Sequence, residues 1–205
     1  WLAGNSFYVV MKCVQGNNLE QIVTQVCPIM VEDVLFLAKE IAKALYAGHE
    51  RGILHLDIKP GNIFLTSEEE VKLAEFGMVM PIENFTTQMG NRVLFGTPLY
   101  ISPEQIRGDE HLDPRTDLYS LGVTMFHLLT GEPPYYGDSD AEILAQHLTA
   151  PVPSVREIKP NIPQAVDDLI RMLMDKRPEL RVPTAKDLES RSEERRVGKE
   201  CRSRW

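Results

Sequence analysis

The sequence contains little cysteine and no long apolar run. Its three cysteines, Cys13, Cys27 and Cys201, are odd in number and do not have the spacing of zinc ligands. This argues against a structural zinc site and against a disulfide framework. No apolar run approaches the roughly 18 residues that a membrane-spanning helix needs, and the first residues do not have the pattern of a signal peptide. We therefore expect a cytoplasmic segment with ordinary thiols.

Positive charge is also scarce. The 205 residues include 22 Lys or Arg and 30 Asp or Glu, which leaves a formal net charge of -8 at pH 7. No stretch within residues 1–190 concentrates the basic residues, which argues against a nucleic-acid partner bound by bulk electrostatics. The hydrophobic content of 43% and the length are typical of one globular domain with a sizeable core.

The two ends differ in character from the rest. The last fifteen residues, "RSEERRVGKECRSRW", hold six Lys or Arg and three acids. A basic tail in solvent would explain them, but they more closely resemble the in-frame translation of a sequencing-library adapter. The sequence starts at Trp1, without an initiator Met, shortly before an apolar stretch. We expect an N-terminally truncated domain over residues 1–190 and a non-native tail over 191–205.

Periodicity in the first half predicts two helices and several short strands. Residues 6–15 are rich in Val, Tyr and Phe and predict a strand that enters a turn at "QGNN", followed by a short helix over 19–23. Apolar residues at helical spacing predict a long buried helix over 31–49, with Gly52 as its stop. Residues 53–77 alternate β-branched runs with Gly and Pro, which is typical of small strands and functional loops.

The second half is predicted to be helical. Residues 116–131 are apolar almost all round and end in Gly, which indicates a core helix. Amphipathic patterns predict further helices over 140–148, 164–174 and 184–189, with a Pro-rich segment over 150–163. The fold class we expect is therefore α+β and mainly helical.

Five motifs follow one another in a recognisable order. They are "HLDIKPGN" (55–62), "EFG" (75–77), "GTPLYISPE" (96–104), "DLYSLG" (117–122) and "KRPELR" (176–181). The first resembles the catalytic loop of protein kinases, H-R-D-x-x-x-x-N, and the others resemble later kinase motifs in the same order. The sequence is similar to the bacterial, eukaryotic-like (Hanks-type) serine/threonine protein kinases. The resemblance implies the kinase fold, with a hinge strand and the helical C-terminal lobe.

The resemblance also implies roles for residues of the expected active site. Asp57 is the expected base for the substrate hydroxyl, and Lys59 neutralises the transferred phosphoryl group. Asn62 and Glu75 are the expected ligands of Mg²⁺, or of Mn²⁺. Thr97 contacts Asp57 and Lys59 beside the acceptor, and "KP" together with "GTP" marks the Ser/Thr type. The residues expected to bind ATP are Met11, Lys12, Cys13, Val14, Lys59 and Asn62.

Four further matched residues are expected to be structural. Glu104 and Arg181 resemble the family's buried ion pair. Asp117 resembles the acid that braces the catalytic loop, with an N-cap role as the alternative, and His55 is expected to be a packed histidine.

The sequence departs from the kinase pattern in three ways. It has neither G-x-G-x-x-G nor a Val-Ala-x-Lys strand, so we expect most of the N-terminal lobe to be missing and this chain alone to be inactive. Leu56 replaces the usual Arg, which suggests that a phosphorylated activation segment does not switch this kinase. Glu75 replaces Asp and adds one methylene to a metal ligand.

Alternatives to an active protein kinase stay open. A pseudokinase scaffold or nucleotide-binding interaction module would keep the fold without turnover, and Leu56 and Glu75 favour it. A small-molecule kinase would share the loop but ignore protein acceptors. We expect ATP and a protein with a Ser or Thr acceptor as partners, no nucleic acid, and no membrane segment in this part, although the full-length protein could be anchored.

Overall fold

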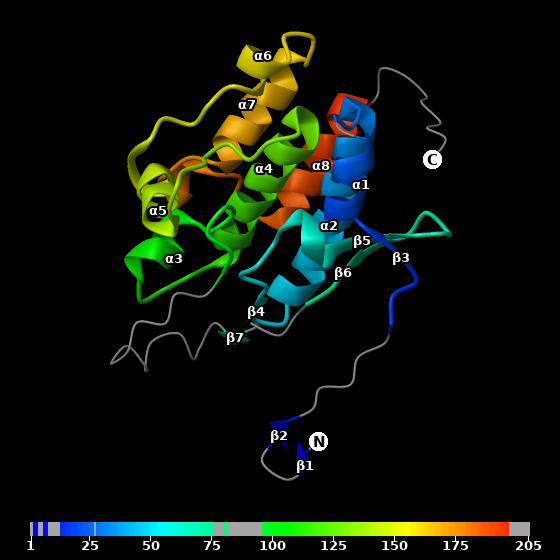
Figure 1. Cartoon of the computed structure of the whole chain (residues 1–205), viewed down its shortest axis with the longest axis vertical. Helices are drawn as coiled ribbons and strands as arrows, with labels where there is room; N and C mark the ends of the chain where they lie inside the picture. The colour runs from blue at the N-terminus through cyan, green and yellow to red at the C-terminus, as the bar shows by residue number, and fades with distance from the viewer. Residues whose placement is uncertain are drawn as a thin grey trace.

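The computed structural model describes residues 2–3, 6–7, 13–26, 28–75, 80–81 and 96–196. Most of the described residues form a helical lobe, and short strands lie along one side of it (Figure 1). No helix in this part of the chain is long and apolar enough to cross a membrane. The helices are α1 (Leu19–Val26), α2 (Val31–His49), α3 (Pro103–Arg107), α4 (Pro114–Thr130), α5 (Asp140–Thr149), α6 (Val155–Ile158), α7 (Gln164–Leu173) and α8 (Ala185–Arg196).

Helix α2 has the bounds that the sequence predicts, residues 31–49. Its apolar positions recur at helical spacing and are buried against α4 and α8. The helix stops shortly before Gly52, whose φ of 70° belongs to the left-handed region that glycine adopts without strain. The apolar residues that recur at helical spacing are all buried: Val34, Leu35, Ala38, Ile41, Ala42 and Leu45.

Helix α4 lies in the middle of the lobe, between α7 on one side and α2 on the other (Figure 1). Its sequence is apolar almost all round because neighbours cover nearly every face. Asp113 caps its first turn by accepting a hydrogen bond from Arg115 N at 2.9 Å, and Gly131 ends it with φ 92°. At Gly122 a Cβ would lie 2.7 Å from Leu173 Cβ, so this glycine lets α4 and α7 approach closely.

The strands form small antiparallel sheets. β3 (Gly16–Asn18), β5 (Ile63–Thr66) and β6 (Val71–Leu73) make one sheet in the order β3-β5-β6. Two-stranded pairs join β1 (Leu2–Ala3) to β2 (Ser6–Phe7) and β4 (Ile53–Leu54) to β7 (Met80–Pro81). Of the strand expected over 6–15, residues 6–7 belong to β2, residues 13–15 have no regular structure, and 8–12 lie outside the described residues.

The predicted turn at "QGNN" is wrong in part, because Gly16–Asn18 is a strand that pairs with β5. Gly16 makes this pairing possible, since a Cβ there would lie 2.2 Å from Leu65 O. Asn18 then starts α1 as a cap: its Oδ1 accepts from Gln21 N at 2.9 Å, and Gln21 Oε1 accepts from Asn18 N at 3.0 Å.

Two short helices were not predicted, and the last helix is longer than expected. α3 and α6 have five and four residues, too few for a periodic pattern to indicate them. Ser102 and Gln105 form a capping box at the start of α3, which is the local signal that could have revealed it. α8 continues to Arg196, beyond the expected boundary at residue 190, and residues 197–205 lie outside the described part.

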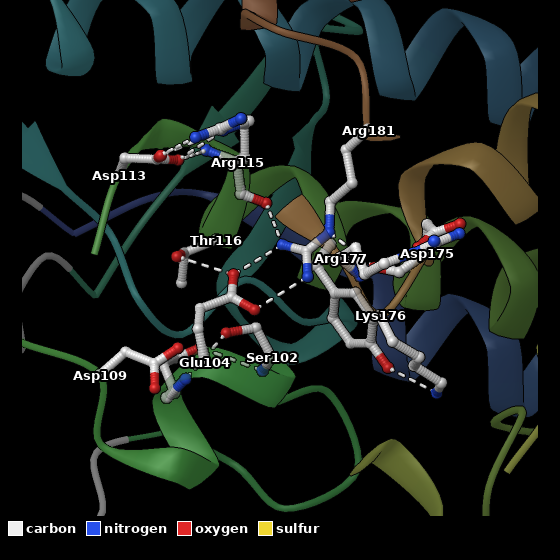
Figure 2. A network of polar contacts seen from close by, with 12 residues as sticks. Ser102, Glu104, Asp109, Asp113, Arg115, Thr116, Asp175, Lys176, Arg177 and Arg181 are labelled. Atoms are coloured by element: carbon white, nitrogen blue, oxygen red, sulfur yellow. Dashed lines mark hydrogen bonds and ion pairs between the residues drawn. The ribbon is translucent and has the colours of Figure 1, made fainter. Parts of the chain in front are cut away.

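A buried ion pair joins α3 to the segment after the 3₁₀ turn η4 (Pro178–Leu180). Figure 2 shows the guanidinium of Arg181 opposite the carboxylate of Glu104, with Nη1 2.6 Å from Oε1 and Nη2 2.8 Å from Oε2. Arg181 also donates to the carbonyl oxygens of Arg115 and Asp175, and Thr116 Oγ1 donates to Glu104 at 3.0 Å. Both charged side chains are almost fully buried, so their mutual pairing compensates the loss of water.

Removal of one partner should therefore be costly. We expect Arg181→Met to lower the free energy of unfolding by about 3–5 kcal/mol, because it leaves the Glu104 carboxylate buried and uncompensated. Arg107→Met is the matched control: it breaks the Arg107–Asp109 pair, whose side chains are each 42% exposed, and should cost about 1 kcal/mol or less. Urea unfolding of the chain measures both, and equal losses would contradict the assigned role of the buried pair.

Candidate active site

Asp57 lies at the centre of a cluster that two distant segments build. It follows β4 and precedes the 3₁₀ turn η1 (Pro60–Asn62), and it is 8% exposed. Its Oδ1 accepts from Thr97 N at 3.1 Å and from Thr97 Oγ1 at 2.8 Å. Its Oδ2 lies 2.9 Å from both Lys59 Nζ and Asn62 Nδ2. The fold thus brings together four of the residues that the sequence singled out.

The charge of Asp57 is balanced inside this cluster. Burial by itself would raise the pKa of the Asp57 carboxyl, but hydrogen bonds from Lys59 and Thr97 and the charge of Lys59 outweigh burial and lower it. The carboxylate is consequently ionised at neutral pH and can accept a hydrogen bond or a proton. Lys59 is held in place as well, because its Nζ also donates to Thr97 Oγ1 at 2.6 Å.

Asn62 has a fixed orientation. Its Nδ2 donates to the backbone oxygen of Asp57 at 2.8 Å and to the Asp57 carboxylate, so the amide nitrogen is the atom that faces Asp57. The Oδ1 atom therefore points away, and no hydrogen bond reaches it from the residues that the structure describes. A carbonyl oxygen in this position is a suitable ligand for Mg²⁺.

Glu75 follows Ala74, which hydrogen-bonds to the 55–62 loop. Ala74 N donates to Asn62 O at 2.8 Å, and Ala74 O accepts from the His55 ring at 3.0 Å, so the N–H and the carbonyl of the preceding residue are both held. Glu75 is exposed and has φ 64°, a left-handed conformation that Asp and Asn adopt more readily than Glu. Phe76 and Gly77 of the motif lie outside the described residues.

The described residues contain no group of three or more His, Cys, Asp or Glu that could hold a metal ion. The expected metal ligands would not form such a group, because Asn62 is an amide and Glu75 a single carboxylate. Mg²⁺ is usually bound by one or two such protein oxygens together with water and substrate phosphates. The residues present therefore suit a nucleotide-bound metal better than a metal held by the protein alone.

Asp117 supports the 55–62 loop through hydrogen bonds to its backbone. It is fully buried in α4; its Oδ1 accepts from Leu56 N at 2.8 Å and its Oδ2 from His55 N at 2.9 Å. The alternative N-cap role belongs instead to Asp113. Sequence reasoning missed His49, the last residue of α2, whose Nε2 lies 2.8 Å from Asp117 Oδ2. The two are 68 residues apart, and no local pattern connects them.

Leu56 occupies the position where the kinase motif has Arg. It is 2% exposed and packs with Leu54 and Leu112 in a small apolar cluster. Its φ of 65° is left-handed, and its carbonyl accepts from Gln105 Nε2 at 3.1 Å. The side chain at this position is thus apolar and turned into the protein, and it offers no charge to an anion.

The expected adenine-binding segment is described only in part. Cys13 is exposed and Val14 half-buried, and both lie shortly before the sheet strand β3. Met11 and Lys12 lie outside the described residues.

Comparison with known proteins decides the family. A family model described as "Protein kinase domain" matches residues 1–191. The chain belongs to the protein kinase family. It is 37% identical over 181 residues to a probable serine/threonine-protein kinase of Clostridium perfringens, and 35% identical over 184 residues to the serine/threonine-protein kinase PrkC of Bacillus subtilis. It is also 35% identical over 187 residues to the serine/threonine-protein kinase PknB of Mycobacterium leprae.

These comparisons confirm the predicted family and the mainly helical kinase fold. The alignments cover 88%, 90% and 91% of this kinase-family chain, but only 26%, 28% and 30% of the three relatives. The chain thus spans about a quarter to a third of their lengths. The family as a whole uses ATP and a divalent metal ion.

The contact of His49 with Asp117 leads to a prediction. We expect His49→Phe to speed hydrogen exchange at the backbone amides of His55 and Leu56 by about tenfold, because the carboxylate that accepts from them loses an orienting donor. His147→Phe is the control, since the side chain of His147 is buried, that of His49 is only 6% exposed, and His147 likewise hydrogen-bonds another side chain, Tyr119 OH at 2.8 Å. Exchange measured by NMR should single out the two loop amides in the first variant only. A uniform increase in both variants would argue for general destabilisation instead.

Proposed function

We propose that the full-length gene product is an ATP-dependent protein kinase that transfers the γ-phosphoryl group to Ser or Thr side chains of proteins. The observation that carries the proposal is the Asp57 carboxylate, held by Thr97, Lys59 and Asn62 within 3.1 Å. Phosphoryl transfer requires positioning and charge neutralisation more than covalent chemistry, and this cluster supplies groups for both.

Asp57 is the proposed base. Its lowered pKa keeps it ionised, so its oxygens can orient the acceptor hydroxyl and receive the proton as the oxygen attacks. Lys59 lies 2.9 Å from the same carboxylate and supplies a positive charge where negative charge moves toward the acceptor. Thr97 holds both groups and borders the acceptor position.

Asn62 and Glu75 are the proposed metal ligands, and the backbone of residues 12–14 is the proposed contact of adenine, with Met11 as the gatekeeper. Mg²⁺, when bound with ATP, would supply neutralising charge between the phosphates. The contribution of this chain is to orient Asn62 Oδ1 away from Asp57 and to hold the backbone before Glu75 through Ala74. The cytoplasmic location, a membrane anchor elsewhere in the protein and the absence of nucleic-acid partners stay predictions.

The Leu56 environment bears on regulation. Its burial with Leu54 and Leu112 supports the proposal that no phosphorylated segment is captured at this position, since capture of a phosphate requires a cation. The apolar contacts can hold the left-handed backbone of Leu56 without such a partner.

A pseudokinase scaffold is the second candidate function. Glu75 favours it, because the extra methylene displaces the carboxylate from the place where Asp would hold a metal that demands near-ideal geometry. This scaffold would bind partners or nucleotide but transfer no phosphate with any divalent metal. A small-molecule kinase would phosphorylate a metabolite and ignore protein acceptors.

Asp57→Asn in the full-length protein tests the proposed base. We expect turnover on a protein acceptor to fall by about a thousandfold or more, because the amide cannot take the proton. The thermal midpoint should change little, since Asn keeps the shape of Asp. Asp138→Asn is the control, because Asp138 is exposed and far from Asp57 in the sequence, and it should leave turnover unchanged. Full activity of Asp57→Asn would exclude this residue as the base.

Glu75→Asp tests the unusual metal ligand. We expect turnover to rise about tenfold, equivalent to about 1.4 kcal/mol of barrier, because Mg²⁺ demands near-ideal geometry and Asp also suits the left-handed backbone. Mn²⁺ should partly rescue the unmodified protein. Glu69→Asp is a matched control, since Glu69 also has a left-handed φ, 59°, but lies in the β5–β6 turn; its turnover should stay unchanged. If neither the unmodified protein nor Glu75→Asp transfers phosphate, the pseudokinase candidate gains support.

A further inference from the structure

Thr97 begins a tight turn beside the proposed active site. Tyr100 N donates to Thr97 O at 2.9 Å and closes a β-turn. Pro98 and Leu99 are the central residues of this turn, and their carbonyl groups take no part in closing it. Thr97 itself holds Asp57 through its N–H and its hydroxyl. The position of the turn therefore depends on the groups that pack against Pro98 and Leu99.

His147 of α5 lies close to this turn. α5 packs on α3, the helix that follows the turn in the chain (Figure 1). The His147 side chain is fully buried, and burial together with the charge of Lys176 lowers its pKa to about 4. The nearby backbone carbonyl groups of Leu99 and Pro98 oppose this shift. The imidazole is therefore neutral at pH 7, and only one of its two nitrogens carries a hydrogen.

Neighbouring donors determine which nitrogen of His147 carries that hydrogen. Nδ1 lies 2.8 Å from the hydroxyl of Tyr119, whose pKa is raised by burial. Lys176 Nζ donates to this hydroxyl oxygen at 3.5 Å and to Tyr135 OH at 2.8 Å. Burial and the charge of Arg181 lower the pKa of Lys176 to about 8, so it is still an ammonium group at pH 7. Because an ammonium group only donates, the Tyr119 hydrogen turns toward Nδ1, and the ring hydrogen lies on Nε2.

His147 Nε2 is the end of this chain of hydrogen bonds. It is buried, and no hydrogen bond joins it to the residues that the structure describes. A buried N–H without an acceptor is unfavourable, and Leu99 and Pro98 supply the carbonyl oxygens near the ring. A small movement of the turn toward α5 therefore completes a hydrogen bond to one of them.

We propose that His147 is a positioning residue that holds the turn over residues 97–100 in the conformation that receives the acceptor segment of a protein substrate. The inference rests on the proposed function, in which this turn borders the acceptor hydroxyl. A turn that is already held costs less to order when the peptide binds, so His147 contributes to peptide affinity more than to the chemical step. Asp57 keeps its contacts with Lys59 and Asn62 in either case.

Kinetics of the full-length protein test this role, with the best substrate from a degenerate library of serine peptides. We expect His147→Phe to raise KM for the peptide about fivefold or more, the effect of one hydrogen bond, and to leave kcat and KM for ATP almost unchanged. His147→Gln should recover part of the peptide affinity, because its amide can donate to the same carbonyl groups.

Thr124→Val is the control for a general loss of stability. Thr124 is fully buried in α4, and its Oγ1 donates to Ser120 O of the same helix at 2.9 Å. The variant removes a buried hydrogen bond that does not involve the turn, so KM for the peptide should stay unchanged. A fall in kcat without a change in KM, or an equal rise of KM in His147→Phe and Thr124→Val, would overturn the proposal.

NMR reports the tautomer of His147 directly. The ¹⁵N shifts of the ring should place the hydrogen on Nε2 in the unmodified protein. Lys176→Met should give a mixture of both tautomers, because the Tyr119 hydroxyl is then free to turn. A hydrogen on Nδ1 in the unmodified protein would contradict the proposed hold on the turn.

Hydrogen exchange separates a failure of this inference from a failure of the proposed function. The Tyr100 amide closes the turn, so its exchange should be about tenfold faster in His147→Phe and unchanged in Thr124→Val. If exchange behaves in this way but no peptide is phosphorylated, His147 holds the turn and the kinase function is what fails. Equal exchange in His147→Phe and the unmodified protein would exclude the hold on the turn, whatever the activity.

Discussion

The buried carboxylate of Asp117 is the interaction on which the geometry of the site depends. It accepts hydrogen bonds from the backbone amides of His55 and Leu56, the two residues directly before Asp57. A fully buried carboxylate is costly unless donors surround it, so the loop and α4 stabilise each other. His49 adds a third donor and extends the same connection to the end of α2. Asp57, the proposed base, is therefore positioned by the core of the helical lobe and not by its own loop alone.

Two residues near this support have strained backbones. Leu56 and Glu75 both have left-handed backbones, which cost about 1–2 kcal/mol for a residue other than glycine. The strain at Leu56 is compensated by its apolar cluster and by hydrogen bonds at both its N–H and its carbonyl. For Glu75, hydrogen bonds hold only the backbone of the preceding residue, Ala74. The two departures from the kinase pattern thus differ physically: Leu56 fits its surroundings, whereas Glu75 is an exposed side chain on a strained backbone.

Several elements could be predicted because their signals are local. The helix over 31–49 and the core helix after Asp113 follow from apolar patterns and glycine stops. The strand at Gly16–Asn18 could not, because "QGNN" has turn chemistry and becomes a strand only where Leu65 offers its backbone. The short helices α3 and α6 could not be predicted, because they are too short to show a periodic pattern.

For the site, the sequence by itself determined the residue types and their order, and hence the kinase family. Asp57, Lys59 and Asn62 lie within one loop, so their spacing already constrained them to be neighbours. The family resemblance already implied the contacts of Thr97 and Asp117 with this loop, which the structure shows. Only the tertiary structure added His49 beside Asp117 and Glu20 over Gly61. Thr97 and Asp117 lie 38 to 62 residues along the chain from the loop residues that they contact. Their contacts depend on how helices pack, and packing is a property of the whole core and not of any short stretch of sequence.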